Sequence, residues 1–386
     1  MDLESIIAVA DLKSGDGQSV WLDKHFQDLL SAIDNGLTEV EGNQVQFGPE
    51  LRDKSVWRVA GMRVDPCAPG CSLVPSPIGK QQTQIRLIVQ PVTGGVMVHD
   101  VAVHLVYSWV DGAGRDDEKF RAILADLDAL KIMSAEIGAP TSGKPLGVHP
   151  GLLVDDAEFH ISIKAFLDKH LTAAQLDSIA LMGIQSGIEP WFFLALTRLP
   201  GDQFGKIPVP IPSAEPQMID FRTPGGRVAP IPIVSNRPGG GVATSALFNA
   251  PLPSLDAFAV VGKDASGNSL QDTELRNRDI PDLIANPLQA HFFNTDCVSC
   301  HTETRRRLRF NLNVGDFAFK PEGHPPPVDA AVLPKDDWNV RNFGWFTPHS
   351  FIGGGPVVET VTQRSANESQ EVVEFIERNF RSETSQ

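Results

Sequence analysis

Two long stretches between residues 83 and 110 have the residue pattern of paired β-strands. Thr83–Val92 and Val96–Val110 are both rich in valine, isoleucine and leucine, which partly alternate with polar residues. The segment Thr93-Gly94-Gly95 between them carries the glycines that a tight turn needs. The pattern therefore predicts a β-hairpin.

Apolar residues change to helical spacing in two later stretches. From Asp116 to Ile137 an acidic first turn leads into a broad apolar face, as expected for a helix whose amino-terminal end favours negative charge. A second stretch runs from Thr172, a suitable N-cap, toward Gly187. Its apolar residues at helical spacing are Leu176, Ile179 and Met182. We expect a helix at both places.

The end of the chain has a third helical pattern. Ser365 followed by Glu368 matches a capping box, in which each residue's side chain bonds a backbone N–H at the start of a helix. The apolar residues that follow at four-residue spacing are Val372, Ile376 and Phe380, with Val373 beside them. This pattern predicts an amphipathic helix with one buried stripe.

Residues 201–253 are rich in proline and glycine, which excludes a helix there. We place a domain boundary in this segment. It is either a flexible linker or an ordered extended strap, because isoleucine and valine are more frequent in it than in most linkers. The chain then divides into a mixed α/β domain at 1–200, the linker or strap at 201–253, and a further domain at 254–386.

Composition and charge narrow the classes of function. Hydrophobic residues make up 41% and charged residues 21% of the 386 residues, as in folded globular proteins. The net charge of −15 repels phosphate backbones and attracts basic partners, so nucleic-acid binding is not expected. No apolar run approaches the roughly 18 residues that a membrane helix needs, so no membrane span is expected.

One short motif carries specific chemistry. Cys297-Val298-Ser299-Cys300-His301 matches the Cys-x-x-Cys-His pattern of c-type haem attachment. On a helix these positions share one face, so both thiols can reach the haem vinyl groups while the imidazole binds the iron. With 4 cysteines and 10 histidines, a chance match is expected in roughly one such sequence in a thousand. The motif predicts one covalently attached haem c, with His301 as the proximal iron ligand.

A Cys-x-x-Cys pair has two other common uses. It can form a thioredoxin-like dithiol, or half of a zinc site whose remaining ligands would be Cys67 and Cys71. A very long stretch of chain separates the two cysteine pairs, which is unusual for zinc. Neither use requires His301, so haem attachment is the interpretation that accounts for all the residues of the motif.

The other two cysteines occur in Cys67-Ala-Pro-Gly-Cys71. This pair cannot be a second haem site of the same kind, because Ser72 stands where the histidine would be. Pro69 and Gly70 favour a tight turn that brings the two cysteines together. We expect a disulfide between Cys67 and Cys71, which an oxidising compartment would keep closed. The alternative is two free thiols.

Residues 279–380 resemble a class I cytochrome c. The stretch from Leu288 through His301 is similar to that family's first helix and haem motif, and residues 365–380 are similar to its terminal helix. The resemblance implies that the terminal helix packs across the first one and closes the haem pocket. It also implies haem attachment outside the cytoplasm. The expected fold class is α+β, with a mixed α/β N-terminal domain followed by a mainly α-helical cytochrome c-like domain.

The second axial iron ligand is missing from its usual place. The family supplies a methionine after the haem motif, whereas no methionine follows Met218 in this chain. His349 and His324 both lie between the two helices of the resemblance, where that ligand arises in the family. His349 is the better placed and His324 the weaker alternative; without either, the iron is open on its distal side.

These observations predict an exported monohaem c-type cytochrome that transfers electrons, with its N-terminal domain binding a partner. The expected partner is a redox protein, preferably basic, and the expected location is the periplasm or the cell surface. Since the sequence begins without an export leader, we expect its signal peptide to have been removed. Two alternatives stay open: a peroxidase-like haem enzyme with an open distal site, or a binding or sensor protein that the haem stabilises.

Overall fold

A computed structural model of the chain describes most of residues 6–207 and separate segments of the remainder. The described residues are 6–34, 47–68, 70–71, 81–94, 96–97, 100–111, 114–154, 157–184, 191–207, 209–210, 217–222, 228–233, 241–242, 284–287, 303, 328–333, 343–346 and 358–381.

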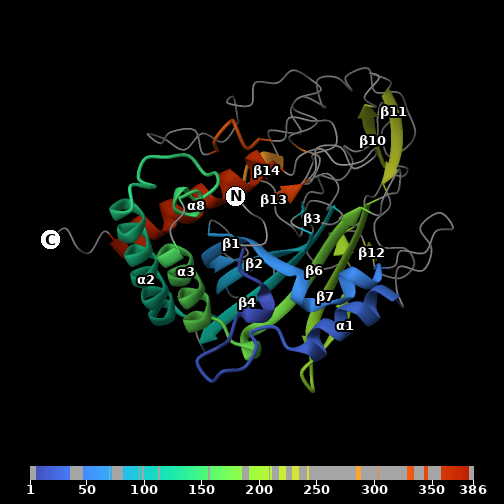
Figure 1. Cartoon of the computed structure of the whole chain (residues 1–386), viewed down its shortest axis with the longest axis horizontal. Helices are drawn as coiled ribbons and strands as arrows, with labels where there is room; N and C mark the ends of the chain where they lie inside the picture. The colour runs from blue at the N-terminus through green and yellow to red at the C-terminus, as the bar shows by residue number, and fades with distance from the viewer. Residues whose placement is uncertain are drawn as a thin grey trace.

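The centre of the molecule is one antiparallel sheet (Figure 1). Its main strands, in spatial order, are β1 (Trp57–Ala68), β2 (Gln82–Thr93), β4 (Asp100–Asp111), β6 (Leu176–Ile184), β7 (Trp191–Leu199) and β8 (Gln203–Ile207). Two short strands complete the eight: β3 (Val96–Met97), which pairs with β2, and β5 (Gly114–Arg115), which pairs with β4. Because each main strand follows its neighbour along the chain, short antiparallel connections suffice for most of the sheet.

The predicted hairpin is confirmed in this sheet. Strand β2 pairs antiparallel with β4, and Leu87 lies opposite Leu105. β2 ends at Thr93, and the following Gly94 has a φ of 59°, which glycine adopts without strain. The turn leads first into the short β3, so the long return strand begins later than the pattern predicts.

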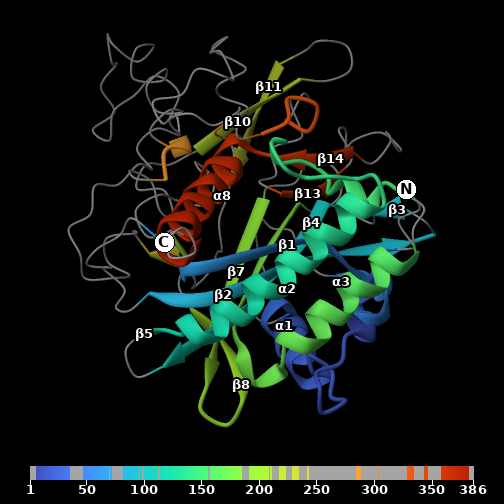
Figure 2. The same cartoon turned by 90° about the vertical axis from the view of Figure 1, so that its left-hand side faces the viewer.

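Three helices cover the face of the sheet that carries Leu87 and Leu105, here called the core face. They are α1 (Asp23–Asp34), α2 (Asp117–Glu136) and α3 (Ala157–His170). Phe26 of α1, Ile123 of α2 and Leu167 of α3 are buried in one apolar cluster with the strands. Figure 2 shows α2 and α3 side by side, in agreement with their direct contacts. This cluster is the main core of the described residues.

Helix α2 confirms the prediction for residues 116–137. Asp116 is its N-cap, and the Asp116 carboxylate accepts the backbone N–H of Lys119 at 2.8 Å. Asp117 and Glu118 follow in the first turn, where the helix dipole favours acidic residues.

The helix predicted from Thr172 toward Gly187 is wrong. A single 3-10 turn, η6 (Ala173–Gln175), leads into strand β6 in the middle of the sheet. The pairing of β6 with β4 includes one extra residue in β6, Asp177. This bulge turns Leu176 and Ile179 to the same side of the sheet, and both are buried in the core. Their spacing of three residues therefore imitates a helix.

The expected fold class is also wrong. The described residues form a mostly antiparallel sheet with four α-helices, contrary to a chain that ends in a mainly α-helical domain, and those after residue 254 combine strands with helix. They include an antiparallel pair, β13 (Phe343–Phe346) with β14 (Val358–Val361). They also include the helix α8 (Gln363–Ile376), which ends in a π-helical turn, η8 (Glu377–Arg381). Aromatic residues dominate the sequence of β13, and such residues are enriched in β-strands.

The proline-rich residues 201–253 contain strands where the structure describes them. β8 belongs to the central sheet, so the sheet continues past residue 200. Two further pairs follow: β10 (Gln217–Arg222) antiparallel with β11 (Val228–Ile233), and β9 (Val209–Pro210) parallel with β12 (Gly241–Val242). Extended backbone suits proline, whose φ is fixed near −65°. The division into domains stays a prediction.

Short helical turns connect several of these elements. They are η2 (Val9–Asp11), η3 (Pro49–Arg52), η4 (Lys54–Val56) and η5 (Pro150–Leu152). Among the described residues, no helix combines the length and the apolar character needed to cross a membrane.

Helix α8 confirms that the chain ends in an amphipathic helix, but the helix begins earlier than predicted. Its N-cap is Thr362, whose hydroxyl oxygen accepts the N–H of Ser365 at 3.4 Å, so the capping box proposed for Ser365 and Glu368 is wrong. Val372 and Phe380 are buried as the stripe predicts, whereas Val373 is 45% exposed. The early start places Glu368 inside the helix, where its side chain meets the sheet.

Candidate functional site

The predicted haem residues Cys297, Cys300 and His301 lie outside the described residues, as do the two candidate distal ligands, His324 and His349. The described residues nearest the motif are 284–287 before it and Glu303 after it. Ile284, Ala285 and Glu303 are all fully buried. The described residues on both sides of the motif are therefore mostly buried.

Helix α8 binds the backbone that precedes the motif. Arg364 donates two hydrogen bonds from one guanidinium nitrogen, to the carbonyl of Ile284 at 3.0 Å and to that of Asn286 at 3.2 Å. The amide of Asn367 donates to the carbonyl between them, that of Ala285, at 2.7 Å. Three successive carbonyls thus accept hydrogen bonds from one helix. Ile284 and Ala285 are helical, and the last carbonyls of a helix need such partners.

The two donor side chains are themselves held in place and buried. Asn367 is fully buried, and its side-chain oxygen accepts a hydrogen bond from the amide of Gln363 at 2.9 Å. Arg364 is also buried, and its second terminal nitrogen pairs with Glu368 at 2.5 Å, one helical turn later. Each donor therefore has a fixed orientation toward residues 284–286.

Glu368 joins α8 to strand β1. Its other carboxylate oxygen accepts a hydrogen bond from Arg63 at 2.6 Å, and Arg63 also pairs with Asp65 at 3.3 Å. We call Arg63, Asp65, Arg364 and Glu368 the Glu368 cluster. Arg63 lies opposite Arg86 of β2, whereas its neighbour Met62 lies opposite Leu87, so the cluster is on the face of the sheet away from the core helices. We call this the second face.

The charges of the Glu368 cluster balance one another. Burial alone would raise the pKa of Glu368, but the positive charges of Arg364, Arg63 and Arg86 outweigh burial and hold the pKa well below its usual range. Burial likewise opposes ionisation of Arg63, and Glu368 and Asp65 outweigh it, so the pKa of Arg63 is raised. Glu368 and Arg63 are therefore both ionised at neutral pH.

Arg86 and His104 extend the second face toward the middle of the sheet. Burial lowers the pKa of Arg86, and the neighbouring positive charge of Arg63 adds to this. Burial together with the charge of Arg86 lowers the pKa of His104 to about 3. His104 is thus neutral at physiological pH, and it lies in strand β4.

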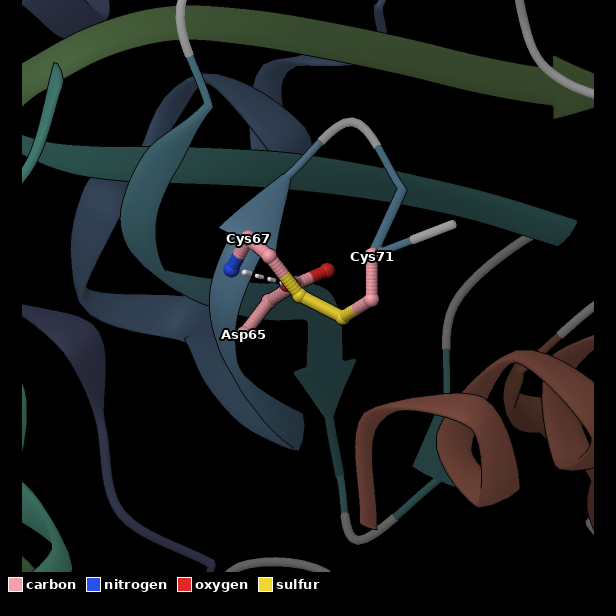
Figure 3. A group of neighbouring side chains, drawn as sticks. All are labelled: Asp65, Cys67 and Cys71. Atoms are coloured by element: carbon pink, nitrogen blue, oxygen red, sulfur yellow. Dashed lines mark hydrogen bonds between the residues drawn. A yellow bond between two sulfur atoms is a disulfide. The ribbon is translucent and has the colours of Figure 1, made fainter. Parts of the chain in front are cut away.

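Cys67 and Cys71 are joined in a disulfide at the end of β1 (Figure 3). The Gly70 N–H donates to the carbonyl of Cys67 at 3.0 Å, which closes the turn between them. The carboxylate of Asp65 accepts the N–H of Cys67 at 2.9 Å, as the dashed line in Figure 3 marks. Both cysteines are buried in an apolar cluster with Phe120 of α2 and Phe375 of α8. The disulfide therefore packs with α2, which covers the core face, and with α8, which covers the second face.

Asp65, Cys67 and Cys71 place three potential metal-ligating atoms within 4.8 Å of one another. A metal would need the cysteines as thiolates, and here their sulfurs are bonded to each other. We therefore interpret this group as a structural cross-link. The carboxylate of Asp65 accepts the backbone N–H of Cys67 and also pairs with Arg63. Asp65 therefore links the disulfide turn to the Glu368 cluster.

Reasoning from the sequence did not find the Glu368 cluster. Arg63 and Glu368 are 305 residues apart, and no local pattern links residues at that separation. One signal was present: Arg364, Asn367 and Glu371 recur at helical spacing, and all are buried in α8. A polar stripe of this kind resembles a solvated helix face, so the sequence alone does not reveal its burial.

Comparison with known proteins adds no family to this picture. No family model, no curated protein and no solved structure matches the chain.

Proposed function

We propose that this protein carries one haem c, attached through Cys297 and Cys300 and ligated by His301, and that it transfers electrons outside the cytoplasm. The observation that carries the proposal is the motif Cys297-Val-Ser-Cys300-His301. Two thiols for the vinyl groups and an imidazole for the iron are the donor set that c-type haem requires. When bound, the haem supplies one-electron chemistry.

The chain's own part is to hold and shield the haem-bearing segment. Residues 284–286 before the motif are fixed to α8, and Glu303 after it is buried. A rigid, water-poor surrounding is what tunes a haem and limits reorganisation around it. His349 would supply the second ligand to the iron, with His324 as the alternative.

Charge and redox chemistry support the proposed location and partner. A disulfide between Cys67 and Cys71 is stable in an oxidising compartment, which is also where c-type haem functions in this proposal. The net charge of −15 favours a basic redox protein as the partner of the N-terminal domain.

One observation favours a second candidate function. No methionine follows Met218, so the iron lacks the usual distal ligand of the resembled family. If neither histidine takes that place, the iron would be open to peroxide or another small ligand, and the second candidate is a haem enzyme of peroxidase type. A low-spin ferric spectrum that becomes high-spin in His349→Ala supports the electron carrier, whereas a high-spin wild type supports the enzyme.

Haem attachment is tested by extraction from protein made in a host that matures c-type cytochromes. We expect acidified organic solvent to leave haem on the wild type and to remove it from the Cys297→Ser/Cys300→Ser variant. The matched control is Cys67→Ser/Cys71→Ser, which also loses two cysteines and should keep its haem. Haem that resists extraction from the first variant would refute the assignment.

A further inference from the structure

Helix α8 is anchored to the rest of the molecule in two different ways. Toward its carboxyl-terminal end, Phe375 and Phe380 pack into an apolar cluster with Phe120 of α2, and Arg381 pairs with Asp128 at 2.5 Å. Toward its amino-terminal end the contacts are polar, through Arg364 and Glu368. The polar end donates hydrogen bonds to the carbonyls of residues 284–286.

Fixing a helix through buried polar contacts costs desolvation free energy. Burying charged side chains costs free energy that an apolar interface of the same shape would not, and it is offset only when every charge is paired. Here Arg364 makes three hydrogen bonds, to two carbonyls and one carboxylate, from the planar guanidinium group whose N–H donors have fixed directions. Such an interface specifies geometry, because a shift of the helix would leave buried charges unpaired.

We propose that Arg364 is a positioning residue that fixes the chain leading into the haem motif against the second face of the sheet. Glu368 orients Arg364, and Arg63 of β1 holds Glu368. These three side chains therefore connect residues 284–286 to the sheet. The inference rests on the proposed function only in linking this contact to the haem. The contact itself follows from the geometry of α8.

Hydrogen–deuterium exchange of the full-length protein tests the contact without reference to haem. In Arg364→Gln, we expect amide exchange in peptides covering residues 284–287 to become at least tenfold faster, while peptides from β4 and β6 stay within twofold of the wild type. The matched control is Arg381→Gln, which removes the ion pair at the other end of α8 and should leave residues 284–287 unchanged.

Two further variants separate positioning from general stability. Glu368→Gln keeps the shape of the side chain and frees Arg364 from its partner, so it should accelerate exchange in the same peptides. Arg364→Lys keeps the charge but cannot bridge two carbonyls and a carboxylate, so it should rescue only in part. If Arg364→Gln does not fold, Glu368→Gln answers the same question.

The effect of Arg364 on the haem is tested by measuring the ratio of reduced to oxidised haem at a fixed solution potential. Arg364→Gln should change this ratio at least threefold, and Arg381→Gln should not. Wild-type exchange rates in both Arg364→Gln and Glu368→Gln would overturn the inference even if haem is bound. Absence of covalent haem from the wild type would instead overturn the proposed function and leave the exchange result to stand by itself.

Discussion

The two faces of the central sheet are covered by helices of opposite character. On the core face, α1, α2 and α3 contribute apolar side chains to one continuous cluster around Trp57 and Leu105. On the second face, α8 meets the sheet through paired charges, with Arg63 and Glu368 still 21% and 26% exposed. The core face is stabilised by burial of apolar area, which tolerates small shifts, whereas the second face depends on exact pairing of charges.

The core face should show the largest effect of a single substitution. Trp57 is fully buried, and its indole N–H donates to the carbonyl of Leu51 at 3.0 Å. Trp57→Ala should lower the free energy of unfolding by about 3–5 kcal/mol, since it opens a large cavity. Denaturant unfolding followed by circular dichroism measures this. The control is Val373→Ala, at an exposed apolar position of α8, where we expect a change of less than about 0.5 kcal/mol.

A loss below about 1 kcal/mol in Trp57→Ala would break the comparison, because the core face would then not be the main source of stability.

The second face should show an intermediate effect that depends on pH. Glu368→Gln leaves Arg63 and Arg364 without their shared carboxylate, and we expect a loss of about 1–3 kcal/mol at pH 7, less than for a fully buried pair. The pKa of Glu368 in the folded protein is below its usual value of 4.5. The stability that Glu368 contributes to the fold is therefore fully present above about pH 4.5 and is lost as the pH falls below that value. The difference between wild type and Glu368→Gln should therefore shrink below about pH 4.5.

The control for this substitution is Glu377→Gln, at a side chain that is 54% exposed near the end of the same helix. It should change stability by less than about 0.5 kcal/mol at any pH. A pH-independent difference for Glu368→Gln would mean that the side chain acts through its shape and not its charge.

The disulfide should contribute the least of the three. Cys67→Ser/Cys71→Ser opens a very short loop, so the lost stabilisation should not exceed about 2 kcal/mol. Peptide mapping without reductant should find Cys67 linked to Cys71 in the wild type. Since the disulfide packs in one apolar cluster with Phe120 of α2 and Phe375 of α8, its loss should loosen the packing of both helices slightly. Free thiols at both positions in protein from an oxidising compartment would remove this role.

The same contrast explains what the sequence could predict. The hairpin of β2 and β4 and the helix α2 were predicted, because local alternation, an N-cap at Asp116 and a helical apolar face all agree with the final structure. Strand β6 was mistaken for a helix, because the bulge at Asp177 gives its core residues a spacing of three. Local patterns therefore fail where an irregular pairing in the sheet changes the period.

Long-range polar contacts were beyond prediction for a different reason. Arg63 and Glu368 each look like ordinary surface residues in sequence, and only the position of α8 on the sheet brings them together. The same holds for Arg364 and the carbonyls of residues 284–286. The haem motif is the opposite case, because its chemistry depends on residues that are adjacent in sequence, and its prediction needs no fold.

Covalent haem is the central claim, and intact mass under denaturing conditions tests it most directly. The wild-type protein, made in cells that mature a known c-type cytochrome at the same time, should have the mass of the chain plus one haem. Its pyridine haemochrome spectrum should be that of haem with two thioether bonds. A mass equal to that of the chain alone, from cells in which the known cytochrome is fully matured, would contradict the account.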